Sequence, residues 1–312
     1  MPHQLSIVVT FRSDHAAFES TLVSVLENRP QGCEIVVVHD GSYQDPFDLT
    51  DEVRFAVASD DSLLSLLRAG VAEARAPLVH VAADGVQVDA GWTDQPLELF
   101  QGQSSPGPVT PVVRESGSGK IVAAGWTRDK NSGRRRIAEG ATSVGRLEAD
   151  RIQGVFLAAS FWPHAILASV LNEIPSIGST VEAEVLAGEL VFMLDRDTLI
   201  ATDSSVYVSP REEDFSVHGY RAAHDTQMTL DLRNDQPVAA TLPAILGQWI
   251  SAVYQPSAWT RAIGRAAAVI FGQPKRRDLA GELDRCADGF LSDERATLKF
   301  PQSHDPPVRR AA

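Results

Sequence analysis

Two aspartates stand directly after predicted buried strands, each followed by a glycine, and their chemistry suits a nucleotide. Asp40 comes before Gly41, and Asp84 comes before Gly85. The Asp40 carboxylate can accept hydrogen bonds from a base or a ribose, and Gly41 allows close backbone approach. The Asp84 carboxylate can hold a hard divalent cation that bridges phosphates. Both dipeptides are also typical of tight turns, in which the aspartate bonds to its own backbone, and this alternative stays open.

Two glutamates, Glu182 and Glu184, are the candidates for a catalytic base. They lie in a segment with helical character, and residues two apart on a helix do not share a face, so only one of them can point into a cleft. A carboxylate there can remove a proton from a hydroxyl. The alternative is that both are N-terminal charges favoured by the helix dipole. The basic run Arg134 to Arg136 either grips a phosphate or forms a solvated face.

The first half of the chain alternates strands and helices, which places these residues at one edge of a sheet. Apolar periodicity predicts strands at residues 5–11, 34–38, 53–57 and 78–82, with helices around residues 18–26 and at 63–74. This alternation predicts an α/β fold with a parallel sheet and helices on its faces, in which ligands bind beyond the carboxyl ends of the strands. The loops that begin at Arg12, His39 and Asp84 all lie at that edge.

The second half is less regular. We expect a strand near residues 152–158, a helix near 182–190 and a strand at 199–208. Residues 242–271 have a helical pattern divided at Pro256, and residues 301–312 have the polar, proline-containing composition of a disordered tail. The expected organisation is a nucleotide-binding domain at 1–215, a helical C-terminal extension at 216–298 and a disordered tail at 299–312.

Composition excludes several classes of protein. There are 28 Lys plus Arg against 41 Asp plus Glu, and the formal charge of -13 opposes binding to nucleic acid. Two distant cysteines without a CxxC motif indicate neither a disulfide framework nor a zinc cluster. The GxGxxG, GxxxxGK[ST] and GxSxG motifs are all missing from the sequence, which argues against dinucleotide enzymes, P-loop proteins and serine hydrolases.

Three segments in series resemble the opening of the family 2 glycosyltransferases. They are LSIVVTF at residues 5–11, TLVSVL at 21–26 and EIVVVHDGS at 34–42. In that family a strand ending near threonine, a TLxSVL helix and EIVVVDDGS follow in this order. The likeness continues at residues 70–79, at Asp84 with Gly91 and Trp92 after it, at 109–125 and at 154–159. The resemblance implies the GT-A fold, a Rossmann-like, mostly parallel sheet flanked by helices, here with a C-terminal helical extension.

The resemblance also implies an activity. It is the transfer of a sugar from a nucleotide-diphosphate donor to a glycan, a lipid-linked molecule or another hydroxyl acceptor, with inversion and with Mg²⁺ or Mn²⁺. Members of the family commonly build polysaccharides and other glycans of the cell envelope. By position, Asp84 matches the metal-binding aspartate, and Glu182 or Glu184 falls near the motif that supplies the catalytic base. The donor nucleotide would be bound at two strand ends, by Thr10, Phe11, Asp40, Gly41 and Ser42.

The chain departs from the family pattern around this site. His39 replaces the first aspartate of DDGS, and Leu67 stands where an arginine often lies. Ala82 and Ala83 occupy positions where another acidic or polar residue is usual, and a single carboxylate leaves most of a cation's ligands to water and phosphate. The alternative function is therefore a degenerate glycosyltransferase fold that binds a nucleotide, a glycan or a partner protein without transferring sugar.

The sequence predicts a cytoplasmic protein, because it has neither a signal-peptide pattern nor an apolar run of about 18 residues. The helical segment at 242–271 carries Trp249, Tyr254 and Trp259, with Arg261 and Arg265 one turn apart. It either packs against the rest of the chain or rests on the inner face of the plasma membrane, where lipid-linked acceptors are found. Any membrane contact would then be peripheral.

Overall fold

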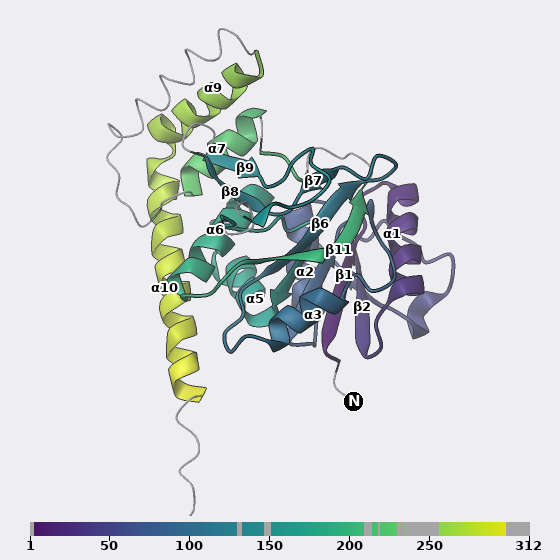
Figure 1. Ribbon diagram of the computed structural model, residues 1–312. Helices are drawn as coiled ribbons and strands as arrows, with labels where there is room; N and C mark the ends of the chain where they lie inside the picture. The colour runs from purple at the N-terminus through teal and green to yellow at the C-terminus, as the bar shows by residue number, and fades with distance from the viewer. Residues whose placement is uncertain are drawn as a thin grey trace, which may run out of the picture.

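A nine-stranded sheet forms the centre of the molecule, with helices packed around it (Figure 1). The computed structural model describes residues 3–129, 133–146, 151–208, 214–217, 219–229, 232 and 256–297. The strands of this sheet are β1 (Leu5–Thr10), β2 (Cys33–His39), β3 (Arg54–Val57), β4 (Leu78–Ala82), β5 (Val86–Val88), β6 (Val109–Glu115), β7 (Ile121–Ala123), β10 (Ala159–Pro163) and β11 (Leu199–Val208). A separate hairpin pairs β8 (Trp126–Asp129) with β9 (Gly133–Arg136).

The strand order is β3-β2-β1-β4-β10-β6-β11-β5, with β7 beside β6. The strands β3, β2, β1 and β4 are parallel neighbours, and β11 is parallel to β6. Antiparallel pairs join β10 to both β4 and β6, β5 to β11, and β7 to β6. The predicted α/β fold is confirmed, with a parallel block of β3, β2, β1 and β4 in a sheet that is mixed as a whole, with four parallel and four antiparallel pairings. Because β1, β2 and β4 point the same way, the residues that follow them meet at one edge.

Five helices pack around this part of the sheet, and three of them begin at a side-chain cap. The five are α1 (His15–Asn28), α2 (Leu63–Glu73), α3 (Asp94–Gln101), α5 (His164–Glu173) and α6 (Thr180–Met193), with a short 3₁₀ turn at Leu49–Asp51. Asp14 caps α1 by accepting from the amide of Ala17, Ser62 caps α2, and Ser179 caps α6. Each cap satisfies an amide that the helix leaves without an internal partner.

Helix α2 lies unusually close to the sheet at Gly70. A Cβ placed on Gly70 would lie 2.5 Å from Cγ1 of Val8 on β1 and 2.8 Å from Cγ2 of Val38 on β2. Both distances are too short for real carbon contacts, so glycine is the residue that permits this packing. The position of α2 matters because its amino end forms part of the site described below.

Most predicted elements are present, with one error. The predicted helix at 63–74 and the strands at 78–82 and 199–208 correspond to α2, β4 and β11. The strand expected near residues 152–158 is wrong, because β10 begins only at Ala159. The preceding stretch makes a single isolated bridge, from Gly154 to Trp126, and is apolar because it is buried in an irregular conformation.

The C-terminal helices are α7 (Gly219–Thr229), α9 (Pro256–Phe271) and α10 (Gln273–Thr297). Helix α10 contributes Leu279, Leu283 and Cys286 to the main hydrophobic core. The predicted helical segment before Pro256 and the predicted tail at 299–312 lie outside the described residues. No helix in the described part of the chain combines the length and the apolar character needed to cross a membrane.

Candidate functional site

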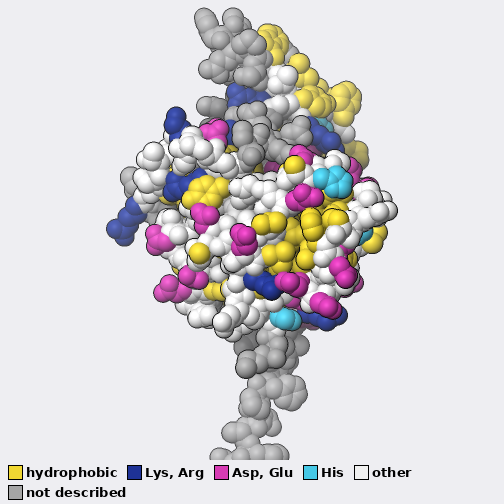
Figure 2. Space-filling model, turned by 90° about the vertical axis from the view of Figure 1, so that its right-hand side faces the viewer, with side chains coloured by type: hydrophobic (Ala, Val, Ile, Leu, Met, Phe, Trp, Pro, Cys, Tyr) yellow, Lys and Arg dark blue, Asp and Glu magenta, His cyan; other side chains and the backbone are white. Residues whose placement is uncertain are grey.

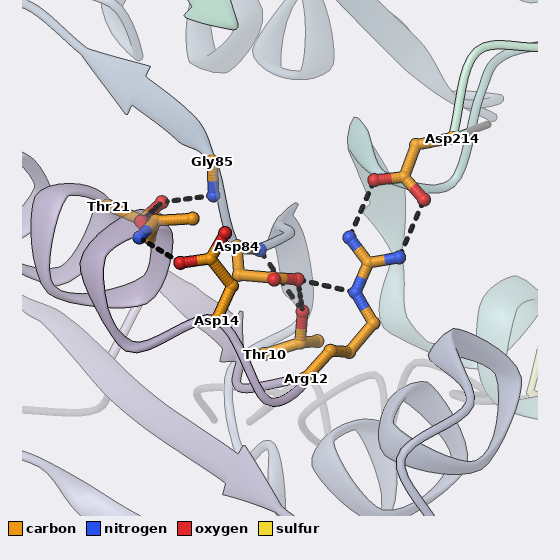
Figure 3. A network of polar contacts seen from close by, with 8 residues as sticks. Thr10, Arg12, Asp14, Thr21, Asp84, Gly85 and Asp214 are labelled. Atoms are coloured by element: carbon orange, nitrogen blue, oxygen red, sulfur yellow. Dashed lines mark hydrogen bonds and ion pairs between the residues drawn. The ribbon is translucent and has the colours of Figure 1, made fainter. Parts of the chain in front are cut away.

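Arg12, which follows β1, links the ends of two strands to a distant segment (Figure 3). Its Nε donates to Oδ1 of Asp84, just after β4, at 2.5 Å. Its Nη1 and Nη2 donate to the two carboxylate oxygens of Asp214 at 2.7 and 2.6 Å, in a forked arrangement. Burial lowers the pKa of Arg12, but the hydrogen bonds and charges of Asp214 and Asp84 outweigh it and raise that pKa above its ordinary value. Arg12 is therefore a fixed cation between two carboxylates.

Thr10 and Phe11, two of the residues predicted to bind the donor nucleotide, have buried side chains. The Thr10 hydroxyl accepts from the amide of Asp84 at 3.3 Å and lies 3.5 Å from its carboxylate. The Phe11 ring packs edge-on against Phe18, with ring centroids 5.2 Å apart, and against Tyr43 at the same separation. Both side chains are used within the fold, so contacts to a nucleoside would fall to their backbone groups.

The turn after β2 holds Asp40, Gly41 and Ser42 at the surface. Oδ1 of Asp40 accepts from the amide of Ser42 at 3.0 Å and from its hydroxyl at 2.5 Å, and these bonds lower the pKa of Asp40. Gly41 has φ of +95°, which side-chain-bearing residues rarely adopt. Nδ1 of His39 accepts from the amide of Gly41 at 3.0 Å. The turn presents an ionised carboxylate that also closes an Asx turn.

A cavity of about 820 Å³ opens beside Arg12, within the size range of small-molecule sites. It is walled by the amino ends of α2, α6 and α7, through Ser62, Leu63, Ser179, Thr180, Gly219 and Tyr220. Arg12, Asp214 and Glu184 also line it. Amide groups at helix starts, together with the helix dipoles, favour anions. The cavity therefore combines helix starts that favour an anion with four carboxylates, those of Asp61, Glu184, Asp214 and Asp225.

A second cavity of about 420 Å³ adjoins the first and shares Ser62, Leu64 and Gly178 with it. Its lining includes Val57, at the end of β3. Val57 lies next to the turn after β2, because a Cβ placed on Gly41 would be 3.9 Å from Cγ1 of Val57. The two cavities lie side by side between the ends of β2 and β3 and Arg12. This arrangement suits an extended ligand.

Of the two candidate bases, Glu184 lines the larger cavity and Glu182 does not. Oε2 of Glu184 accepts from Nη2 of Arg134 at 2.7 Å, and Oε1 accepts from the amide of Leu157 at 3.0 Å. Burial raises the pKa of Glu184, although Arg134 acts in the opposite direction. A carboxylate whose pKa is raised towards neutrality is suited to proton transfer.

Glu182 is committed to the start of α6. Its carboxylate accepts from the amide of Gly178 at 2.7 Å and pairs with Lys275 of α10, and its own amide donates to Ser179. It is 1% exposed. This arrangement fits the alternative stated above, a helix N-terminal charge, and it joins α6 to α10.

The basic run at β9 forms neither a phosphate grip nor a uniformly solvated face. The Arg134 side chain is 1% exposed, and its guanidinium lies over the rings of Trp126 and Phe156, 4.9 and 5.0 Å from their centroids. It pairs with Glu184. Arg135 points outwards, as the alternation of a strand requires. Arg134 therefore holds the base candidate in place.

The surroundings of Asp84 do not fit a divalent cation. The Asp84 side chain has no exposed surface, and Ala82 and Ala83 before it offer no side-chain ligands. Mg²⁺ needs about six oxygen ligands at about 2.1 Å, whereas Oδ1 of Asp84 already accepts a hydrogen bond from a guanidinium. Among the residues that the structure describes, no group of three or more His, Cys, Asp or Glu side chains could hold a metal ion.

Arg12 and Asp214 are the site residues that sequence reasoning missed. They stand 202 positions apart, and neither lies in a motif. The only signal for Arg12 was its place in the loop after β1, at the ligand-binding edge of the sheet. Asp214 had no signal at all, because its role depends on where the segment 214–217 lies in space.

Comparison with known proteins identifies the fold. No protein-family model and no curated protein matches the sequence. S. aureus TarS, residues 1–349, in complex with UDP-GlcNAc, is similar with a TM-score of 0.56 and 12% identity over 93% of this chain and 92% of that one. The same TarS segment in complex with UDP gives a TM-score of 0.52 at 12% identity and the same coverage.

GalNAc-T7, solved with UDP, GalNAc and Mn²⁺, is also similar, with a TM-score of 0.51 and 12% identity over 68% of this chain and 44% of that one. At these identities the likeness concerns the fold. The chain has the GT-A glycosyltransferase fold, as the sequence resemblance implied.

Proposed function

On this fold, we propose that the chain is a glycosyltransferase that moves a sugar from a nucleoside diphosphate to a hydroxyl acceptor. One observation carries the proposal: the cavity of about 820 Å³ at the carboxyl end of β1 brings three helix starts together with Glu184. The helix starts suit a diphosphate, and the carboxylate suits proton removal. Its position agrees with the rule that open α/β sheets bind ligands beyond the carboxyl ends of their strands.

The donor is proposed to lie along both cavities. The nucleoside occupies the cavity of about 420 Å³, with Asp40 and Gly41 at its border, and the diphosphate and sugar occupy the larger one. Two of the structures similar to this chain contain UDP, and a third contains UDP-GlcNAc. Uridine diphosphate sugars are therefore the first donors to test.

The chemical step is an in-line displacement with Glu184 as the base. One carboxylate oxygen of Glu184 takes the proton of the acceptor hydroxyl, and the hydroxyl oxygen forms a bond to the anomeric carbon. The bond between that carbon and the phosphate oxygen breaks, and the nucleoside diphosphate leaves with the electron pair, which inverts the configuration. Arg134 and the amide of Leu157 orient the carboxylate.

The charge of the diphosphate must be offset for this step. The sequence resemblance assigned that task to Asp84 with Mg²⁺ or Mn²⁺, and GalNAc-T7 was solved with Mn²⁺. In this chain Asp84 bonds to Arg12 instead, so the proposed step relies on the amide groups at the starts of α2, α6 and α7 and on no metal.

The test combines binding and transfer. Uridine diphosphate sugars are incubated with a panel of glycan and lipid-linked acceptors, and the glycosylated product is measured by mass spectrometry. The substitution Glu184→Gln should lower kcat by about 10²–10⁴-fold without abolishing nucleotide binding. Glu173→Gln, at an exposed position of α5, is the matched control and should leave kcat unchanged. Undiminished turnover in Glu184→Gln would remove Glu184 from the mechanism.

The second candidate function, a binding module without transfer, is favoured by the commitment of Asp84 to Arg12. Calorimetry with the same nucleotide sugars separates the two. Tight nucleotide binding with no product from any acceptor supports the module, whereas product formation eliminates it.

We further propose a cytoplasmic protein whose α9 contacts a membrane peripherally. Trp259, Ile263, Ile270 and Phe271 on α9 are 40–78% exposed, and Figure 2 shows hydrophobic side chains at this upper end of the molecule. Spaced i, i+4 and i+11, the first three share one side of the helix. In a liposome flotation assay, Ile270→Ser with Phe271→Ser should reduce binding, and Val23→Ser on the exposed face of α1 should not.

A further inference from the structure

We propose that Arg12 takes the place of a divalent cation at Asp84, so that this chain binds its donor without a metal. The inference rests on the proposed donor site, and it concerns the charge that Asp84 holds there. Asp84 is the carboxylate at the end of β4 that the family resemblance assigned to a metal, and here its Oδ1 accepts from Nε of Arg12 at 2.5 Å. The cation at this position is thus part of the chain.

Access is the first argument. The Asp84 side chain has no exposed surface, and the Arg12 side chain is 18% exposed. An ion that reached the Asp84 carboxylate, for example from the cavity of about 290 Å³ that Asp84 lines with Asp14 and Asp214, would compete with the guanidinium for it. Bound to the Asp84 oxygen at about 2.1 Å, it would then lie close to a second positive charge, which Coulomb repulsion disfavours.

Arg12 also links two segments that are far apart in the chain. A bound cation joins ligands from separate segments, and Arg12 does the same: Nε binds Asp84, while Nη1 and Nη2 hold Asp214 in a forked pair. The forked arginine–carboxylate pair fixes orientation as well as distance. Figure 3 shows the chain of contacts running from Thr10 through Asp84 and Arg12 to Asp214.

The link shapes the cavity. Asp214 and Ser216 line the cavity of about 820 Å³. Phe215 between them is 2% exposed, and its ring packs against Phe156 with the centroids 5.6 Å apart. Arg12 therefore pins one wall of the proposed donor site to the ends of β1 and β4. Arg12 is a positioning residue that joins these segments, as a bound ion would.

Direct metal binding is the first arm of the test, and it needs no nucleotide. Mn²⁺ alone is titrated into the full chain and followed by electron paramagnetic resonance. The expected result is no site that depends on Asp84. A Mn²⁺ site in the unsubstituted chain that disappears in Asp84→Asn would overturn the proposal.

The second arm measures the affinity for uridine diphosphate in EDTA and in Mn²⁺. The two dissociation constants should agree within about twofold. An affinity more than about tenfold weaker in EDTA, with the difference lost in Asp84→Asn, would also overturn the proposal. If the nucleotide binds under neither condition, the proposed function fails, and the Mn²⁺ titration still decides the present inference.

The third arm is rescue by a cation. Arg12→Met should lower the melting temperature and weaken uridine diphosphate binding about tenfold or more, and Mn²⁺ should restore part of both, because Asp84 and Asp214 then lack their cation. Arg12→Lys keeps the charge without the forked pair, so its melting temperature and its affinity for uridine diphosphate should lie between those of Arg12→Met and those of the unsubstituted chain. Arg29→Met, at an exposed pair with Glu52, is the matched control. Failure of Mn²⁺ to improve either property of Arg12→Met would contradict the proposal.

Discussion

Substituting Gly70 by alanine tests how closely α2 is seated on the sheet. In an exposed helix interior this change stabilises a protein by about 1 kcal/mol, because alanine loses less backbone entropy. At Gly70 the new Cβ would approach Val8 to 2.5 Å and Val38 to 2.8 Å, and both valines are fully buried. Overpacking costs about 1–3 kcal/mol, and two contacts with stiff β-branched side chains place the cost near the upper end. The net expectation is a loss of about 2 kcal/mol.

The matched control is Gly281→Ala on α10, where a Cβ meets nothing within 4 Å. It should gain about 1 kcal/mol, so the two variants should differ by about 3 kcal/mol. With a urea dependence of about 3 kcal/mol/M, their unfolding midpoints, followed by circular dichroism, should differ by about 1 M.

Partial relief provides a second check on the reasoning. Val8→Ala removes one of the two clashing methyl groups, so the double variant with Gly70→Ala should be less destabilised than the sum of the single variants. A Gly70→Ala protein that unfolds at the same urea concentration as the unsubstituted chain, or at a higher one, would refute the account of α2 packing.

Three further predictions concern buried groups. Burial lowers the pKa of His80 to about 3, whereas the unfolded chain binds this proton near pH 6.5. The unfolding free energy therefore falls by about 1.4 kcal/mol per pH unit as the pH drops from about 6.5 towards 3. His80→Phe should remove this contribution from the difference in unfolding free energy between pH 8 and pH 5, measured by urea unfolding. Arg134→Met leaves Glu184 buried without its ion pair and should cost about 3–5 kcal/mol of unfolding free energy, partly recovered by adding Glu184→Gln. Burial raises the pKa of Cys286 to about 12, so a thiol reagent at pH 8 should modify half-buried Cys33 in the native protein and Cys286 only after unfolding; comparable native labelling of both would contradict the packing of α10.

The turns that follow β2 and β4 could be predicted from the sequence because their signals are local. The run of β-branched residues in β2 and the polar turn from His39 to Ser42 are neighbours in the chain, and turn chemistry follows from residue type. The same holds for Asp84 after β4. Predictions from such patterns needed no knowledge of distant partners.

The contacts of these residues could not be predicted, because partners far apart in the chain decide them. Asp84 has the sequence context of a metal ligand, and only the fold shows that its carboxylate binds Arg12, which in turn binds Asp214. In the same way, three consecutive arginines indicate an exposed face until Trp126 and Glu184 are found around Arg134. An apolar stretch at 152–158 suggests a strand, and only the packing of Gly154 on Trp126 shows otherwise.

The burial of α10 in the main core has a consequence for synthesis of the chain. Leu279, Leu283 and Ala287 of α10 lie in the main core, where α10 packs against α5, α6 and α7 and covers their apolar surface. The last strand of the sheet ends at Val208, about 80 residues earlier. At about 5–20 residues per second, the ribosome finishes the sheet about 4–16 s before the helix that covers this surface is made. During that interval the nascent chain exposes an apolar surface that chaperones or other nascent chains can bind.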